Sequence, residues 1–468
     1  MAQKFSHCIL LFFLIFPTSS YAEIASNLEF PRTQAEKFIR SLNLFPKHDV
    51  NHHVDGGCEV TEVGESRIAE KRIELPYLGD SGANVKDLGH HAGYYRLPHT
   101  KDARMFYFFF ESRNSRVDPV VIWLTGGPGC SETCLLLGMI LVGIRFQTLY
   151  SSHTDDIRHS EDGVSNDLYN FLQAFFKEHP QYVKNDFYIT GESYEGHYIP
   201  ALAARVHRGN KNKEGVYINL KGVAIGNGLT NPEIQYKAYT DYALDMQLIK
   251  QSDYKSMSKS VLQCEQAIKL CGTEGGTFCV GAYVFCNTIF NKIVELAGDK
   301  NYYDIRKKCQ GSLCYDFSNV ENFLNQESVK DILGVGNIDF VSCSSAVHEA
   351  MIMDWMRNLE VGIPSLLENG IKLLVYAGEY DLICNWLGNS RWVHAMEWSG
   401  QREFVAASTV PFSVDRVEAG LQKAHGPLTF LKVYNSGHMV PMDQPKASLE
   451  MLRRWMHNRL TDDHLVPM

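Results

Sequence analysis

The pattern of apolar and polar positions predicts strands that alternate with helices. Short, bulky, apolar runs rich in β-branched or aromatic residues are typical of strands buried on both faces of a sheet. Such runs occupy residues 105–111, 119–124, 187–190, 220–225, 371–377 and 428–433. Apolar residues recur at helical spacing from Val164 until Pro180, and helices are also expected at 197–206 and 447–460. The expected fold class is therefore α/β, with a mostly parallel central sheet.

The first residues carry a targeting pattern. Lys4 provides a basic start, residues 9–16 are apolar, and Ser20-Tyr21-Ala22 is a small-x-small cleavage site. This pattern predicts a signal peptide over 1–22, too short to span a bilayer, and no later stretch is expected to span one. We expect entry into the secretory pathway, with an extracellular or vacuolar destination.

Residues 23–90 are polar and mixed, with one short helix expected at 33–42. We interpret this segment as a pro-region or a loosely held N-terminal arm. At 468 residues, the chain can form either a large core with an insertion or two domains. The net charge of −9 and the lack of a basic block argue against a nucleic-acid partner.

An insertion is expected at 232–340, between a first core part at 91–231 and a second at 341–468. The insertion is helical, charged and rich in cysteine, as a cap over a site would be. In a secreted chain, cysteines usually form disulfides. Nested spacing suggests Cys264–Cys286 around Cys271–Cys279, followed by Cys309–Cys314. Zinc binding is the rival interpretation, but no tight C-x-x-C pairs occur, so no metal is expected.

Three residues that can perform nucleophilic catalysis each follow a predicted strand. Ser193 lies in a G-x-S-x-G turn between a strand and a helix, which is the layout of a nucleophile elbow. Asp381 and His438 follow later strands, and a base oriented by a carboxylate is what activates a serine hydroxyl. The alternative is that Asp381 caps a helix and His438 is an ordinary loop residue. The order Ser, Asp, His at strand ends favours catalysis.

The strand at 119–124 leads into a glycine-rich turn, Thr125 to Cys130. Such a turn can present backbone N–H groups to an anion. The alternative is a tight loop without a ligand, and the turn alone does not decide between them.

Five longer motifs resemble the serine carboxypeptidase family, in particular its plant serine-carboxypeptidase-like members. They are WLTGGPGCS (123–131), GESYEGHYIP (191–200), GNGLTNP (226–232), YAGEYDLICNWLGN (376–389) and SGHMVPMDQP (436–445). The resemblance implies an α/β-hydrolase fold and a secreted exopeptidase that removes C-terminal residues from peptides in acid. It implies no cofactor, and the oligomeric state stays open.

The resemblance also assigns roles. Ser193 matches the family nucleophile, Asp381 the orienting acid and His438 the general base. The remaining matches are Gly127 and Tyr194 for the oxyanion hole, Thr125, Gly126 and Glu192 for binding the substrate's terminal carboxylate, a Cys130–Cys343 disulfide, and a buried free thiol at Cys384.

The chain departs from the family pattern in three places. Thr125 stands where the family has Asn, and Glu195 replaces a small residue in the elbow. The interval 132–155 is shorter than usual, as after a deletion or a mis-assembled gene product. Two outcomes stay open there: residues 141–149 take the place of the lost strand, or the central sheet lacks a member.

These departures leave three functional hypotheses. The first is a serine-type carboxypeptidase that works through an acyl-enzyme. The second is an acyltransferase on the same scaffold. The third is a catalytically impaired pseudoenzyme, which the shortened interval and Glu195 favour and the intact triad opposes.

Overall fold

The computed structural model describes residues 68–73, 90–112, 114–130, 142–150, 154–311 and 313–460. All of them belong to the second of two units, His52–Met468. The signal peptide expected at 1–22, the helix expected at 33–42, and Cys8, Cys58 and Cys134 lie outside the described residues.

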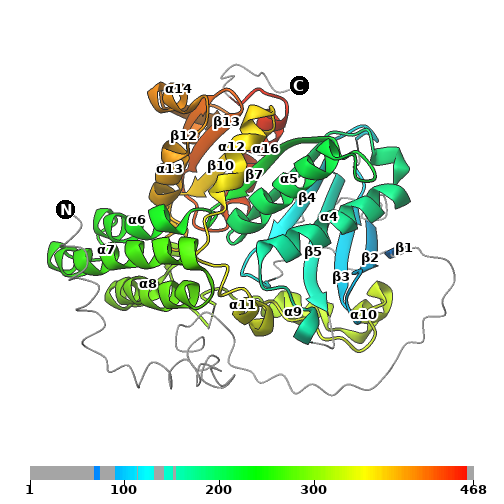
Figure 1. Ribbon diagram of the computed structural model, residues 1–468, viewed down its shortest axis with the longest axis horizontal. Coiled ribbons are helices and arrows are strands. Elements are labelled where there is room, and N and C mark those ends of the chain that lie inside the picture. The colour runs from blue at the N-terminus through cyan, green and yellow to red at the C-terminus, as the bar shows by residue number, and fades with distance from the viewer. Residues whose placement is uncertain are drawn as a thin grey trace. The chain divides into compact units, whose positions relative to one another are not determined.

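An eleven-stranded sheet organises the described residues (Figure 1). The strand order is β1-β2-β3-β5-β4-β6-β7-β10-β13-β12-β11. The strands from β5 to β13 in this order run parallel, and the strands at both margins are antiparallel. Their bounds are β1 (Ile68–Arg72), β2 (His90–Arg96), β3 (Arg104–Phe110), β4 (Val120–Thr125), β5 (Val142–Tyr150), β6 (Phe187–Glu192), β7 (Leu220–Gly226), β10 (Lys372–Gly378), β11 (Val410–Val414), β12 (Val417–His425) and β13 (Leu428–Val433).

The shortened interval contributes a strand to this sheet. β5 pairs in parallel with β4, from Val120 opposite Val142 to Trp123 opposite Arg145. Its other edge pairs with β3 in the antiparallel sense. Of the two outcomes left open by the sequence, the structure therefore has the one in which residues near 141–149 fill the strand position.

Helices cover both faces of the sheet, which explains why its central strands are apolar throughout. In β4, Ile122 faces a core that includes α4 (Glu161–Glu178), α5 (Glu195–Lys211), α12 (Ile363–Glu368) and α13 (Trp386–Ala395). The neighbouring Val121 faces the opposite core, with α16 (Pro445–Met456). Alternate side chains of one strand are thus buried in two different layers.

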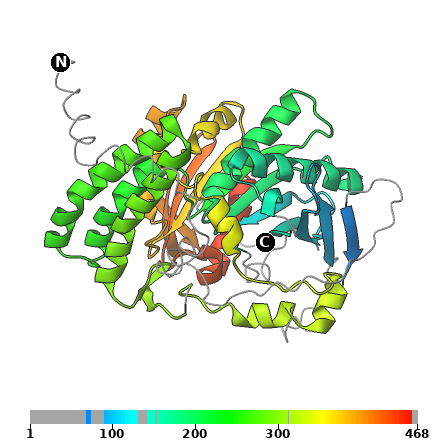
Figure 2. The ribbon, with the colours of Figure 1, turned by 60° about the horizontal axis from the view of Figure 1, so that its bottom comes forward.

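Three long helices form the cysteine-rich part of the insertion: α6 (Pro232–Asp245), α7 (Gln251–Glu274) and α8 (Gly276–Ala297). They lie side by side in both ribbon views (Figures 1 and 2). Disulfides Cys264–Cys286 and Cys271–Cys279 join α7 to α8. Among the described helices, α8 alone is long and apolar enough to cross a membrane, although no later span was expected. This test uses length and composition only, and the core helix of a soluble protein also passes it.

The residues of the expected insertion that follow α8 are not part of the three-helix cap. A short hairpin, β8 (Lys300–Asn301) with β9 (Asp304–Lys308), follows α8. Next, α9 (Ser318–Leu324) and α10 (Glu327–Leu333) pack on β2 and β3, where Leu324 and Val329 share a core with Phe106 and Phe108. β1 pairs with β2 in the same sheet although it lies within 23–90. The remaining helices are α11 (Ser345–Ala350), α14 (Gln401–Ala406) and α15 (Val440–Asp443).

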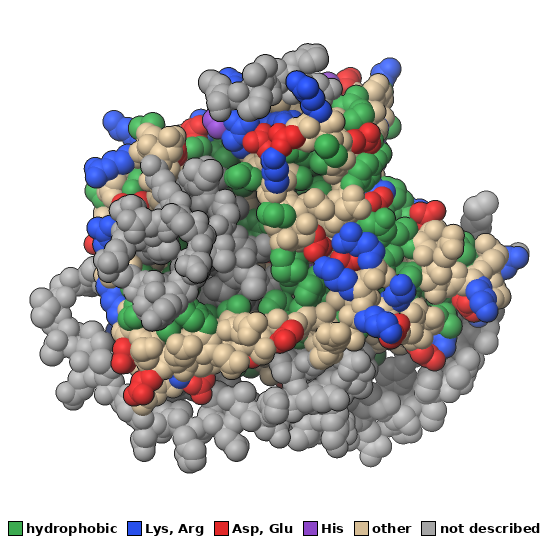
Figure 3. Space-filling model, turned by 180° about the vertical axis from the view of Figure 1, so that it is seen from behind, with side chains coloured by type: hydrophobic (Ala, Val, Ile, Leu, Met, Phe, Trp, Pro, Cys, Tyr) green, Lys and Arg blue, Asp and Glu red, His purple; other side chains and the backbone are tan. Residues whose placement is uncertain are grey.

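Charge on the described surface is mixed. On the face shown in Figure 3, Lys and Arg side chains are interspersed with Asp and Glu side chains. The net charge of the whole chain is −9, and the absence of a nucleic-acid partner stays a prediction.

Candidate active site

Ser193 lies in the turn between β6 and α5. Its backbone has a left-handed conformation that residues other than glycine rarely adopt. Its φ is +80°, which costs free energy and persists only where the surroundings fix it. The Ser193 N–H donates to the Gly226 carbonyl (2.9 Å), and the Ser193 carbonyl accepts from the Leu229 N–H (3.0 Å). A Cβ on Gly196 would lie 2.2 Å from the Leu229 carbonyl oxygen, so the turn is pressed against the segment after β7. This contact holds the strained residue in place.

Asp381 and His438 form a buried pair. His438 Nδ1 lies 2.8 Å from Asp381 Oδ2, and both side chains are almost completely excluded from solvent. Asp381 follows β10 and His438 follows β13, two neighbouring parallel strands, so the pair forms where their carboxyl ends meet. The Asp381 carboxylate also accepts from the Asn227 side-chain amide (2.7 Å) and from the Cys384 N–H (3.3 Å).

Asn227 is a site residue whose role the sequence did not reveal. It follows β7 with a φ of +42°, and its N–H donates to the Tyr376 carbonyl (2.8 Å). Its side-chain oxygen accepts from the Gly378 N–H (3.2 Å), while its amide nitrogen donates to Asp381. Gly226, the preceding residue, holds Ser193. The turn after β7 therefore links the serine to the acid, and the Gly-Asn-Gly sequence after a strand was the available signal.

The glycine-rich turn lies directly against Ser193. Thr125 pairs with Glu192 at the ends of β4 and β6. A Cβ on Gly126 would lie 2.6 Å from the Ser193 Cβ and 2.7 Å from the Tyr194 nitrogen, so only glycine fits there. Gly127 has a φ of +116°, in the region that favours glycine. The turn ends at Cys130, which is disulfide-bonded to Cys343.

Glu192 and Glu195 are both buried beside this turn. A Cβ on Gly191 would lie 2.3 Å from the Glu195 Cγ, so the glycine provides the space that the larger Glu195 side chain occupies. Burial, and then the charges of Asp381, Glu195 and Glu192, raise the pKa of the Cys384 thiol. Cys384 is the only free cysteine among the described residues, and it is buried.

A second group of titratable side chains, Tyr194, Glu161 and Asp354, lies close together next to the elbow. The Tyr194 side chain is buried, and burial followed by the charges of Asp354 and Glu161 raises its pKa. Glu161 starts α4, and its N–H donates to Asp354 Oδ1 (3.3 Å). Burial raises the pKa of Asp354 to about 6, and burial and then Asp354 raise that of Glu161.

This arrangement suits covalent acyl transfer. A base held by a carboxylate lies at the same end of the parallel strands as a serine on a strained turn, and the glycine-rich turn packs directly against that serine. Among the described residues, no group of three or more His, Cys, Asp or Glu side chains is placed to hold a metal ion.

A family model and individual relatives both place this chain in the same protein family. The family model described as "Serine carboxypeptidase" matches residues 81–139 and 149–458. Serine carboxypeptidase-like 48 from Arabidopsis thaliana is 60% identical, with 97% of this chain and 96% of that protein covered. Serine carboxypeptidase 3 from Oryza sativa subsp. japonica is 57% identical, over 98% and 97%.

The alignment with the Arabidopsis relative spans 496 positions, more than this chain's 468 residues, so that relative carries residues with no counterpart here. Among solved structures, the prohormone-processing carboxypeptidase Kex1(delta)p from Saccharomyces cerevisiae has a TM-score of 0.72. It is 24% identical and covers 81% of this chain and 94% of its own, which supports the α/β-hydrolase fold. The chain therefore belongs to the serine carboxypeptidase family, a family of hydrolases.

Proposed function

We propose that this protein is a secreted serine-type carboxypeptidase that releases C-terminal residues from peptides at acid pH. The observation that carries the proposal is the buried His438–Asp381 pair, 2.8 Å apart, at the sheet edge where Ser193 occupies a strained turn. A strained backbone at Ser193 and a buried His–Asp pair each reduce the stability of the fold. Their combination is what nucleophilic catalysis by serine requires.

In the proposed reaction, the Ser193 Oγ attacks the carbonyl carbon of the last peptide bond while His438 Nε2 takes the hydroxyl proton. Asp381 holds the imidazole by its Nδ1 and stabilises the imidazolium. The proton then passes to the departing amine as the C–N bond breaks, which leaves an acyl-enzyme on Ser193. Water, deprotonated by His438, attacks the ester carbon; the bond to the Ser193 Oγ breaks, His438 returns the proton to that oxygen, and the shortened peptide is released.

We assign the oxyanion hole to the backbone N–H groups of Gly127 and Tyr194. Such donors stabilise the tetrahedral intermediate, and losing one typically slows turnover about 10² to 10³-fold. The contact of Gly126 with both Ser193 and Tyr194 supports this assignment, because it brings the glycine-rich turn against the start of α5.

We assign recognition of the substrate's terminal carboxylate to Thr125, Gly126 and Glu192. Thr125 and Glu192 pair at the ends of adjacent strands, next to Ser193. A carboxyl group binds another carboxylate favourably only when one of the two carries a proton. The proposal therefore includes activity that is higher in acid than at alkaline pH.

Four disulfides among the described residues, together with the expected signal peptide, support a place in the secretory pathway, extracellular or vacuolar. The N-terminal segment before β1 is proposed to be a pro-region. Peptides with a free C-terminus are the proposed substrates.

A fluorophosphonate probe tests the nucleophile. We expect a peptide-mapped adduct on Ser193, no labelling in Ser193→Ala, and normal labelling in Ser258→Ala, which changes an exposed serine of α7. A folded wild-type protein that does not react would refute the proposal. A blocked dipeptide and its C-terminal amide then test the activity, since only the free acid should turn over, and faster at pH 5 than at pH 8. Turnover of a glucose ester with an alcohol acceptor, but not of the dipeptide, would indicate an acyltransferase instead.

A further inference from the structure

The hairpin β8–β9 of the insertion contacts both loops that carry the buried pair. The Tyr302 carbonyl accepts from the N–H groups of Leu382 and Ile383 (3.1 Å each), next to Asp381. The Tyr303 carbonyl accepts from the His438 N–H itself (2.7 Å). One two-residue turn thus holds the backbone next to Asp381 and the backbone of His438.

Side chains extend these contacts. The Tyr303 ring centroid lies 5.0 Å from that of His438. The Arg306 guanidinium lies over the Tyr380 ring, 4.6 Å from its centroid, and the Ile305 N–H donates to the Tyr380 carbonyl (3.0 Å). The hairpin therefore packs on the residue before Asp381 as well as on the residue that supplies the base.

Asp304 makes ionic contacts with two other residues of the hairpin, Arg306 and Lys307. Its side chain is completely buried, and it accepts a two-pronged contact from Arg306, with Nε to Oδ1 at 2.8 Å and Nη2 to Oδ2 at 2.7 Å. Lys307 Nζ lies 3.1 Å from the same carboxylate. A buried charge is tolerated only when it is paired in this way, and removal of one partner leaves the others without compensation.

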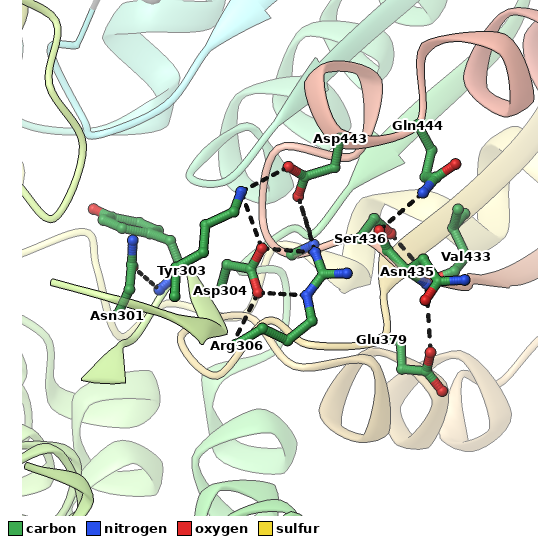
Figure 4. A network of polar contacts seen from close by, with 12 residues as sticks. Asn301, Tyr303, Asp304, Arg306, Glu379, Val433, Asn435, Ser436, Asp443 and Gln444 are labelled. Atoms are coloured by element: carbon green, nitrogen blue, oxygen red, sulfur yellow. Dashed lines mark hydrogen bonds and ion pairs between the residues drawn. The ribbon is translucent and has the colours of Figure 1, made fainter. Parts of the chain in front are cut away.

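The ion pairs of Asp304, Arg306 and Lys307 extend to Asp443, at the end of the helix α15 that follows His438. Lys307 Nζ contacts Asp443 Oδ1 (2.9 Å), Arg306 lies 3.8 Å from Asp443 Oδ2, and that oxygen accepts from the Gly437 N–H (2.8 Å). Figure 4 shows Asp304 and Arg306 of the hairpin joined to Asp443, the last residue of α15. Two carboxylates and two cations balance each other.

Gly437 shows how closely the two parts fit. A Cβ there would lie 2.4 Å from the Tyr303 carbonyl oxygen and 2.7 Å from the Asp304 Cβ. A shift of Asp304 is therefore transmitted to the residue before His438 by direct contact.

We propose that Asp304 is a positioning residue for the reaction and that the hairpin aligns His438 with Asp381. The inference deepens the proposed function and rests on it. In this view the insertion does more than cover the site, because its hairpin completes the support of the base. Loss of the Asp304 charge leaves Arg306 and Lys307 to compete for Asp443, which pulls on Gly437 and misaligns His438.

The test compares Asp304→Asn with Asp299→Asn. The control removes a carboxylate from the residue before the same hairpin, where an exposed Asp299 contacts an exposed Lys308 at 2.8 Å. We expect Asp304→Asn to lower kcat about 10- to 100-fold, as misplaced reacting groups do, with KM changed less than about threefold. We expect the control to match wild type. Lys307→Met, which removes a partly exposed member of the same group, should give a smaller fall in kcat and serves if Asp304→Asn does not fold.

A second readout does not depend on turnover. In the proton NMR spectrum, a hydrogen bond from His438 Nδ1–H to Asp381 should give a low-field resonance, assigned by its loss in His438→Gln. We expect that resonance to shift or broaden in Asp304→Asn and to stay in place in Asp299→Asn. A folded Asp304→Asn protein with wild-type kcat and an unmoved resonance overturns the inference. Wild-type protein that shows the resonance but neither reacts with the probe nor turns over peptide contradicts the proposed function instead.

Discussion

The buried pair of Glu161 and Asp354 makes stability depend on pH, and Glu161→Gln isolates the effect. Both carboxyl groups have a pKa above the ordinary value, so the folded protein retains protons that the unfolded chain releases. The stability that they contribute is complete below about pH 4. It decreases as pH rises through the raised pKa values of the two groups, of which that of Asp354 is about 6.

The magnitude follows from Asp354. Its pKa rises from 3.8 to about 6, and each pKa unit corresponds to about 1.4 kcal/mol. Asp354 alone therefore makes the free energy of unfolding about 3 kcal/mol smaller at pH 8 than at pH 4. Glu161→Gln removes one ionising group and the repulsion between the two, while an amide of similar size keeps the packing. We expect the variant to equal wild type at pH 4.5 and to be more stable by roughly 1–3 kcal/mol at pH 7.5.

Urea denaturation followed by tryptophan fluorescence measures this difference at the two pH values. Glu178→Gln is the matched control, because it removes an exposed carboxylate at the far end of the same helix, α4. The control should change the midpoint little at either pH. A Glu161→Gln midpoint that shifts equally at pH 4.5 and pH 7.5 would show that the pair does not hold its protons as argued.

Three further changes probe the site. Asn227→Ala removes the amide that donates to Asp381. We expect the free energy of unfolding, measured by urea denaturation, to fall by about 1–3 kcal/mol, and kcat to fall as well. Unchanged values for both would contradict the role given to Asn227. Cys384 is buried with a raised pKa, so iodoacetamide should modify it only after unfolding, as mass spectrometry would show; rapid alkylation of the native protein would count against its burial. Gly196→Ala places a Cβ against the Leu229 carbonyl, so we expect little soluble protein, whereas Gly281→Ala, with open space around its Cβ, should express normally; equal yields would argue against the close contact.

Strands covered on both faces were the part of this protein that the sequence predicted well. β13 has the predicted bounds, Leu428–Val433, because such a strand is mostly apolar, and only Thr429 and Lys432 interrupt the apolar residues here. β9 was missed because only two residues of its charged sequence, Asp304–Lys308, are buried. Burial of a carboxylate such as Asp304 depends on partners distant in the sequence, and local patterns carry no record of them.

The candidate site shows the same division. Ser193, Asp381 and His438 became candidates because each follows an apolar run. The structure brings Asp381 and His438 into contact, and the three catalytic roles stay predictions. The support that Asn227 and Tyr303 give to this pair was not predicted, since it rests on a side-chain amide and a backbone carbonyl from other loops. The place of β5 between β3 and β4 was likewise left open, because strand pairing is a property of the assembled sheet.

The Cys130–Cys343 disulfide has a consequence for how this protein responds to a protease. The two cysteines lie on either side of the insertion, 213 residues apart in the sequence. The other three disulfides each close within one side of the exposed residues 298–300. Hydrolysis there would yield two polypeptides that remain one covalent molecule. Ser193 would lie on one polypeptide and His438 on the other, joined until a reductant separates them.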